Sequence, residues 1–128
     1  MPFTAITDRD IVVGDGVGLQ SFKASGTILR GQAVEIVEDG YVIATDSKPA
    51  KAFVGVAQDS ATAGNMVGVW TPGNIVWSRA SGTGIVAGDR LVATVNGLFQ
   101  DEIGGSGARG IALSTQGTTL GVVKVLLI

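Results

Sequence analysis

Apolar residues along the chain fall into short runs that are bounded by turn-forming residues. Valine, isoleucine and threonine dominate the apolar positions, and few windows of ten residues lack a glycine, so an amphipathic helical period is hard to find. Short, regularly spaced runs are typical of β-sandwiches and barrels. The pattern predicts an all-β fold, a compact sandwich or small barrel. Its strands are expected at residues 17–24, 33–37, 41–45, 53–58, 66–71, 75–79, 90–95, 98–100, 110–114 and 121–128.

Three turns are the clearest local features. Asp39-Gly40 and Asn96-Gly97 each separate two apolar runs, and both dipeptides accept the positive φ values of a tight hairpin turn. Thr71-Pro72-Gly73-Asn74 is a third turn, in which proline presets φ and glycine or asparagine can take the left-handed position. Trp70 and Trp77 flank this turn, so we expect them to be partners in one hairpin.

The chain contains an internal repeat. Ala24-Ser25-Gly26-Thr27 recurs as Ala80-Ser81-Gly82-Thr83, and the features that follow recur in the same order. We interpret this as two similar β units, residues 24–71 and 80–127, a pseudo-duplication. Each unit has roughly four strands, too few to bury both faces alone, so we expect the two units to share one core. The further matches are Gly31 with Gly88, Val34 with Leu91, Asp39-Gly40 with Asn96-Gly97, Gly55-Val56-Ala57 with Gly110-Ile111-Ala112, and Val67-Gly68-Val69 with Val123-Lys124-Val125.

This organisation predicts a single β domain over residues 18–128. Residues 1–17 lie outside the repeat, and we expect them to form an extended N-terminal arm. A frayed terminus is the alternative, but Phe3 and Ile6 favour an arm that orders on a partner, because a frayed end seldom needs apolar anchors.

Residues that could carry chemistry are few. Cysteine and histidine are absent, which excludes disulfides, thiol nucleophiles and sites of the Ser-His-Asp or Cys-His type. The cluster Asp8, Asp10 and Asp15 lacks the ligand order and the final bidentate Glu of a calcium loop. Gly105-Ser106-Gly107-Ala108-Arg109-Gly110 matches a nucleotide-binding pattern, but a predicted strand follows it instead of a helix. We therefore predict no catalytic, metal or cofactor site, and a protein that is not an enzyme.

Charge is scarce along the chain. Charged residues make up 16% of it, where about 25% is ordinary, and the formal net charge is −2. The basic residues form no stripe, so we expect no nucleic-acid partner. The apolar C-terminal end is far shorter than the roughly 20 residues of a membrane helix, so we expect no membrane partner. The start of the chain does not read as a signal peptide, and we expect synthesis and folding in the cytoplasm.

Low charge and a mean hydropathy of +0.41 indicate that copies of the chain or a partner cover part of the surface. A compact monomer with a Ser/Thr/Gly surface is the alternative. The strand at residues 121–128 is apolar on both alternating faces, so it is either central or at a subunit contact. Tryptophan combines large apolar area with an N–H donor and is enriched at interfaces, although a core role is the alternative. The candidate subunit-interface residues are Trp70, Trp77, Leu126 and Ile128.

A succession of segments resembles the small capsid decoration proteins, also called cementing or head-stabilising proteins, of tailed bacteriophages and related viruses. The likeness spans about residues 17–127. It consists of the order in which Gly, Ala and Val recur between turns, and it does not involve reactive residues. The segments that carry it are Ile28-Leu29-Arg30-Gly31-Gln32-Ala33-Val34, Asp39-Gly40-Tyr41-Val42, Phe53-Val54-Gly55-Val56-Ala57, Ala61-Thr62-Ala63-Gly64-Asn65-Met66-Val67-Gly68-Val69-Trp70, Val86-Ala87-Gly88-Asp89-Arg90-Leu91, Asn96-Gly97-Leu98 and Gly110-Ile111-Ala112-Leu113.

The resemblance implies a structural virion protein on the capsid exterior. Such a protein binds the assembled capsid, bridges major capsid protein subunits and is frequently a homotrimer. A clamp that binds the assembled shell, and not its dissociated form, stabilises the shell by its binding free energy. The resemblance also implies that the N-terminal segment touches the shell. Its capsid-binding residues here are expected to be Pro2, Phe3, Thr4, Ala5 and Ile6.

An alternative function is a carbohydrate-binding or adhesin-like β module. Trp70 and Trp77 would then be sugar-stacking platforms. A flat, exposed pair of indoles would favour this alternative, whereas two buried indoles would leave it without sugar-binding residues.

Overall fold

The computed structural model describes residues 18–47, 52–82, 84–102, 107–116 and 121–128. Within these residues the fold is all-β, as the sequence predicts, and each of the ten expected strands is present within a few residues of its expected bounds. No helix in the described part of the chain has the length and apolar character needed to cross a membrane. The strands are β1 (Leu19–Ala24), β2 (Ala33–Glu38), β3 (Tyr41–Ala44), β4 (Phe53–Ala57), β5 (Met66–Trp70), β6 (Ile75–Ala80), β7 (Arg90–Ala93), β8 (Phe99–Asp101), β9 (Gly110–Ala112) and β10 (Gly121–Leu127).

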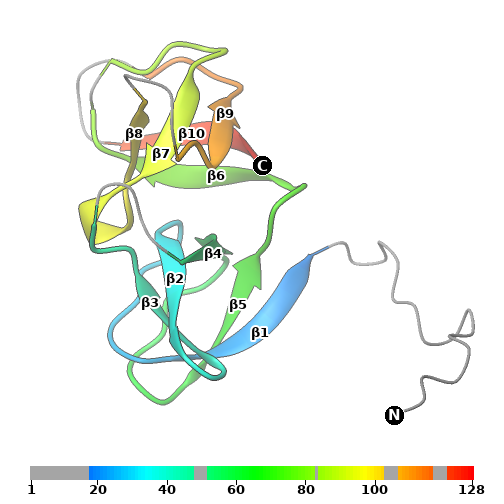
Figure 1. Ribbon diagram of the computed structural model, residues 1–128, viewed down its shortest axis with the longest axis vertical. Coiled ribbons are helices and arrows are strands. Elements are labelled where there is room, and N and C mark those ends of the chain that lie inside the picture. Colours follow the sequence, from blue (N-terminus) through cyan, green and yellow to red (C-terminus); the bar gives the residue numbers. More distant parts are fainter. Residues whose placement is uncertain (1–17, 48–51, 83, 103–106, 117–120) are drawn as a thin grey trace, which may run out of the picture.

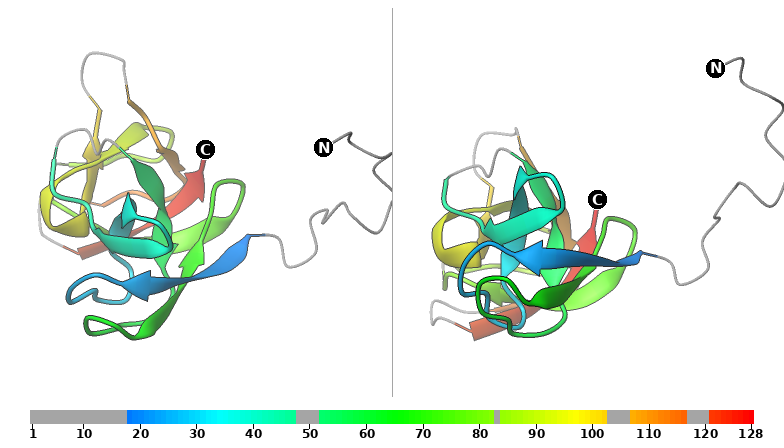
Figure 2. Two further views of the ribbon diagram at one scale, coloured as in Figure 1. Left: turned by 60° about the horizontal axis from the view of Figure 1, so that its bottom comes forward. Right: turned by 90° about the horizontal axis from the view of Figure 1, so that it is seen from below.

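The strands close into two small five-stranded barrels that follow one another along the long axis of the molecule (Figure 1). The first barrel has the order β1-β3-β2-β4-β5, and the second has the order β10-β6-β8-β7-β9. Each barrel contains one parallel pair, β1 with β3 and β6 with β8, and its other pairs are antiparallel. β1 closes the first barrel between β3 and β5, and it lies beside β5 in Figure 2. The duplication seen in the sequence is therefore a duplication of topology.

The residues that match between the two units occupy equivalent places in the barrels. Gly31 N–H donates to the Ala57 carbonyl at 2.9 Å, and Gly88 N–H donates to the Ala112 carbonyl at 2.8 Å. Val34 and Leu91 are both fully buried. Because matched positions carry equivalent backbone bonds and line the corresponding core of each barrel, packing explains why these residues are alike in the two units.

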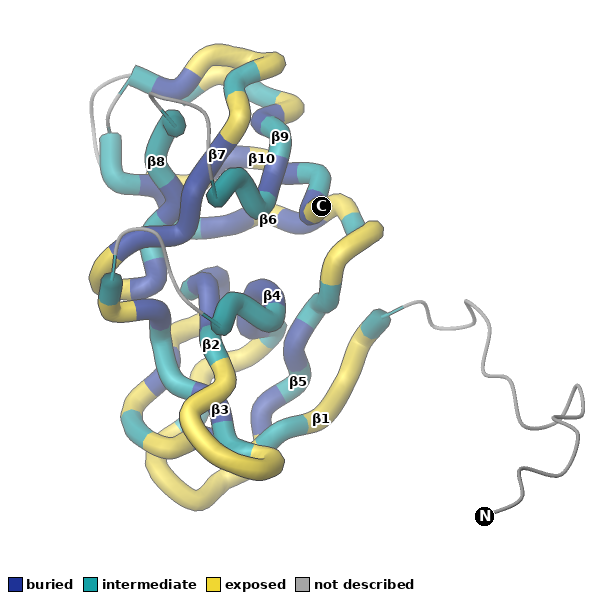
Figure 3. Tube along the Cα trace, viewed as in Figure 1, coloured by how far each residue is buried: buried dark blue, intermediate teal, exposed yellow. Residues whose placement is uncertain are grey.

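The units at residues 24–71 and 80–127 contain four strands each, β2 to β5 and β7 to β10, as the sequence predicts, but the expectation of one shared core is wrong. Each barrel has a fifth strand, β1 or β6, of which only the last residue, Ala24 or Ala80, belongs to the matched tetrapeptide. A closed five-stranded sheet has an interior of its own, so the structure contains two core clusters. One cluster fills the first barrel, whereas the other fills the second barrel and extends to Ala33 and Val56 of the first. Buried segments accordingly run through both barrels, while the turns at the far ends are exposed (Figure 3).

The turns behave as their sequences predict, with one exception. Gly40 has φ 79°, and Asn96 and Gly97 have φ 61° and 65°, in a short 3-10 turn η2 (Val95–Gly97). Gly73 also takes a positive φ. However, the turn at Gly73 joins the two barrels instead of closing a hairpin. The predicted pairing of the strands that carry Trp70 and Trp77 is wrong, because β5 pairs with β1 and β4 while β6 pairs with β8 and β10.

Hydrogen bonds hold the two barrels against each other. The Thr45 hydroxyl donates to the Thr94 carbonyl at 2.5 Å, and Gly97 N–H donates to the Thr45 carbonyl at 3.1 Å. On the other side of the junction, the Gly31 carbonyl accepts from the Ser78 hydroxyl at 3.0 Å and from Arg79 N–H at 2.8 Å. Thr45, Ser78 and Thr94 are the buried polar residues among those that the structure describes. These three residues therefore all lie where the barrels meet.

We expect Thr45→Val to lower the free energy of unfolding by about 1–2 kcal/mol, because it leaves the buried Thr94 carbonyl without its donor. Urea denaturation followed by circular dichroism measures the change. Thr45→Ser keeps the hydroxyl and is the matched control. A valine variant as stable as the wild type would show that this bond contributes nothing to the junction.

Candidate docking surfaces

Exposed apolar side chains are prominent on the described surface. The described residues contain no group of three or more Asp or Glu side chains placed to hold a metal ion. Large apolar residues that stand out from the body occur on both barrels, and the most exposed of them are Met66, Ile75, Trp77, Val86 and Val122. Contiguous apolar surface of this kind marks protein contacts when its members share one face, so their placement on the sheets matters.

One such face is formed by β6 and β10. The register pairs Ile75 with Leu126, Trp77 with Lys124 and Arg79 with Val122, so these six side chains share one side of the sheet. The alternate residues of both strands point into the second barrel and are buried. Ile75, Trp77 and Val122 are 57%, 60% and 56% exposed. We call the six residues Ile75, Trp77, Arg79, Val122, Lys124 and Leu126 the β6–β10 face.

The β6–β10 face is the broad side of a sheet. β10 is hydrogen-bonded to β6 on one side and to β9 on the other. An unpaired strand edge would recruit any extended chain through its backbone, whereas this face offers side chains only. Its selectivity therefore depends on its apolar and cationic groups.

A hollow of about 260 Å³ adjoins this face at the junction of the barrels. Trp70 and Trp77 both line it, together with Ile75, Arg30 and Gln58. Trp70 is half-buried and packs against the core of the second barrel, whereas Trp77 is exposed. The indoles therefore meet at one site, but they are neither a flat exposed pair nor both buried.

The structure brings together part of the predicted interface set. Trp77 and Leu126 lie on the β6–β10 face, and Trp70 lines the adjoining hollow. Ile128 is exposed just beyond the end of β10, where its N–H donates to the Arg109 carbonyl at 3.1 Å. The role of these four residues in a subunit interface remains a prediction. The arm residues Pro2, Phe3, Thr4, Ala5 and Ile6 lie outside the described residues.

The sequence prediction missed Ile75 as a member of this surface. A signal for it was present, because residues 75–80 place Val76 and Ala80 on one alternating face and Ile75 and Trp77 on the other. A strand with large apolar residues on both faces cannot bury both in a small closed barrel, since only one side faces the interior. The same argument, applied to the strand at residues 121–128, identified Leu126 as a candidate interface residue.

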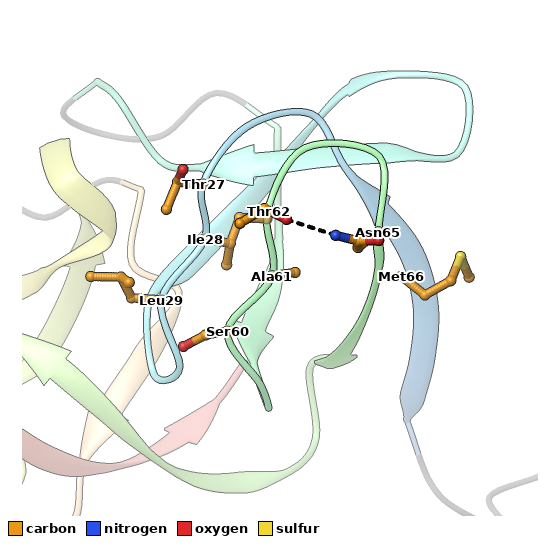
Figure 4. A pocket seen from close by; sticks show the side chains of 8 residues that line it. All are labelled: Thr27, Ile28, Leu29, Ser60, Ala61, Thr62, Asn65 and Met66. Atoms are coloured by element: carbon orange, nitrogen blue, oxygen red, sulfur yellow. Dashed lines mark hydrogen bonds between the residues drawn. The ribbon is translucent and has the colours of Figure 1, made fainter.

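A second hollow, of about 470 Å³, lies on the first barrel (Figure 4). Its walls are the loops around Ile28 and Ala61, which are joined by two backbone hydrogen bonds of 2.8 and 2.9 Å. The Asn65 amide donates to the Thr62 hydroxyl at 2.6 Å and fixes the turn before β5. Leu29 and Met66 stand at opposite sides of the opening (Figure 4). The residues that line this hollow are uncharged, so it offers apolar and neutral polar contacts.

Comparison with known proteins identifies a relative in fold. No protein-family model matches the chain, and no curated protein matches its sequence. The tandem-barrel fold occurs in a solved structure, the N base of the head fiber protein gp8.5 of bacteriophage phi29. The two chains are 15% identical, the match covers 86% of this chain and 92% of that one, and the TM-score is 0.67. The similarity covers both barrels and shows that the fold is shared.

Proposed function

We propose that this chain is a structural protein of a bacteriophage virion that attaches to the outside of the head. The observation that carries the proposal is the tandem-barrel fold, which matches the phi29 head fiber base over nearly the full length of both chains. The sequence resemblance to capsid decoration proteins points to the same surface of the same kind of particle. These two likenesses rest on different properties, one on backbone topology and one on the order of local motifs.

The finer proposal is that the chain bridges major capsid protein subunits and stabilises the assembled shell. Exposed apolar residues on both barrels are suited to contacting more than one neighbour at a time. Several weak contacts on an assembled shell add up through effective concentration, and they are lost when the shell dissociates. A homotrimer would multiply these contacts threefold and cover part of the apolar surface.

Co-sedimentation with purified heads of the phage that carries this chain tests the proposal. The intact chain is expected to pellet with the heads, and removal of residues 1–10 is expected to weaken binding at least about tenfold, since burial of Phe3 and Ile6 is lost. Heads with the chain bound should also release their DNA at a higher temperature. Failure of the intact chain to bind would refute the proposal, and unchanged binding after truncation would refute the arm alone.

The carbohydrate-binding alternative has weaker support. Flat sugar platforms need exposed ring faces, and Trp70 is half-buried against the core of the second barrel. Only Trp77 could serve, next to Gln58 and Arg30 in the same hollow. Binding of the intact chain to a glycan array that is abolished by Trp77→Ala would favour this alternative over attachment to the head.

A further inference from the structure

The charge of the chain is divided unevenly between its first residues and its body. Residues 1–17 hold three of the eleven carboxylates, at Asp8, Asp10 and Asp15, and one of the nine basic residues, at Arg9. The remaining 111 residues therefore carry eight acidic and eight basic side chains, and the formal net charge of −2 lies entirely within residues 1–17. Ile11, Val12 and Val13 lie between these carboxylates, so the segment is both acidic and apolar.

The β6–β10 face has the complementary character. Its apolar members are flanked by Arg79 and Lys124, and Arg30 lines the adjoining hollow. The Arg79 Nε donates to the Arg30 carbonyl at 2.7 Å, which holds this guanidinium at the edge of the face. No carboxylate occurs among the described residues that line the face or the hollow. An extended segment with apolar residues between carboxylates fits such a surface.

The chain leaves the body beside this face. The Gly18 carbonyl accepts two hydrogen bonds from Thr71, from its N–H and its hydroxyl, both at 2.8 Å. Past Thr71 the turn contacts the end of β10, where Gly73 N–H donates to the Leu127 carbonyl at 2.8 Å and Leu127 N–H donates to the Asn74 carbonyl at 2.9 Å. The start of β1 and the C-terminus accordingly lie on the same side of the molecule (Figure 1).

The distance that the N-terminal segment would have to cover along the β6–β10 face is short. From Ile75 to Arg79 the face extends four residues along β6, or about 13 Å. Residues 8–17, when extended, span up to about 33 Å, which is enough to turn back and lie along the face. Because the segment is tethered to the body, its effective concentration at the face is in the millimolar range, far above that of a second copy in dilute solution.

We propose that residues 8–15 dock on the β6–β10 face of their own chain, with Ile11, Val12 and Val13 against Trp77 and Val122 and the carboxylates facing Arg79 and Lys124. The face is then covered in the free protein, and the segment is anchored so that residues 2–6 extend from a fixed point. This inference concerns the isolated protein, so its outcome is independent of whether the chain binds a phage head.

Tryptophan quenching tests the proposal. In a Trp70→Phe background Trp77 is the sole tryptophan, since the chain has two. Removal of residues 1–17 is expected to raise the acrylamide quenching constant of Trp77 about twofold, because a weak tethered contact is occupied for at least half of the time. Asp8→Asn, Asp10→Asn and Asp15→Asn together should give part of that rise, whereas Glu38→Gln with Asp39→Asn, on the far hairpin, should give none. Equal quenching in the intact and truncated chains would overturn the proposal.

A second measurement uses the unaltered chain, in case Trp70→Phe disturbs the core. A zero-length carboxyl-to-amine cross-linker is expected to join Asp10 or Asp15 to Lys124 within a monomer more often than to Lys23, which lies on the first barrel. Monomers in which Lys23 is the preferred partner would contradict docking on the β6–β10 face. Cross-links to Lys124 found only in dimers or larger species would show that a second copy supplies the segment, and they would overturn docking within one chain.

Discussion

Replacement of Phe99 by alanine is expected to lower the free energy of unfolding by about 3–5 kcal/mol, the largest loss that we anticipate from a single side chain. Phe99 lies on β8, is fully buried and is the largest of the fully buried side chains described. Its ring meets the ring of Phe53 edge to face, with centroids 5.9 Å apart and planes at 71°. Phe53 belongs to β4 of the first barrel, so the truncation opens a cavity in the second core and also removes a contact between the barrels.

Chemical denaturation followed by both far-ultraviolet circular dichroism and tryptophan fluorescence measures this loss. Trp77→Ala is the matched control, since it also removes an aromatic ring, but one that is 60% exposed, and we expect a change within about 1 kcal/mol. Coincident transitions by the two probes would indicate that the barrels unfold as one unit. If Phe99→Ala is no more destabilised than Trp77→Ala, the assignment of Phe99 to a tightly packed core is wrong.

The strands could be predicted from the sequence because their limits depend on local chemistry. Asp39-Gly40 and Asn96-Gly97 fix two turns through backbone conformations that other residues reach only with strain. Between turns, residues such as Val67 and Val69 alternate with more exposed neighbours, and this period of two identifies a strand regardless of its partner. Both signals act over a few residues, so one sequence is sufficient to detect them.

Strand pairing could not be predicted in the same way. β1 pairs in parallel with β3 and antiparallel with β5, and the second of these pairings joins residues 43 to 51 positions apart. Loop-closure entropy and the interior volume decide such pairings, and neither is visible in a local pattern. The turn at Pro72-Gly73 illustrates the limit, because its residues favour a turn equally well whether it closes a hairpin or links two barrels.

The candidate surface was partly predictable for a related reason. Apolar residues on both faces of a strand indicate either a central strand or a contact beyond the local sheet, and the structure puts Leu126 on the outward face of β10. The pattern does not say which outward-facing strands are neighbours. Ile75 joins the β6–β10 face because β6 pairs with β10, and this pairing follows from barrel closure instead of from the sequence around Ile75.

Replacement of Gly55 by alanine is expected to lower the free energy of unfolding by about 3 kcal/mol. Gly55 is buried on β4, and a Cβ there would overlap the carbonyl oxygen of Trp70 and lie 2.8 Å from its carbonyl carbon. Both atoms belong to the backbone of β5, the neighbouring strand that closes the barrel, so they cannot move aside by a rotamer change. Relief requires β4 and β5 to separate, and thermal unfolding measures the resulting loss.

The duplicated fold supplies its own comparison for this prediction. Gly110 is the equivalent residue on β9, but a Cβ there overlaps the terminal methyl Cγ1 of Val125, and the equivalent carbonyl, that of Leu126, is 3.4 Å away. A side chain adjusts more easily than a strand, so we expect Gly110→Ala to cost about 1–2 kcal/mol. Gly26→Ala, which meets only the end of the Ile43 side chain at 3.3 Å, should change stability by less than about 1 kcal/mol. Equal losses at Gly55 and Gly110 would mean that the two barrels close with the same strand spacing, and that the closer approach of β5 to β4 is not a feature of the folded protein in solution.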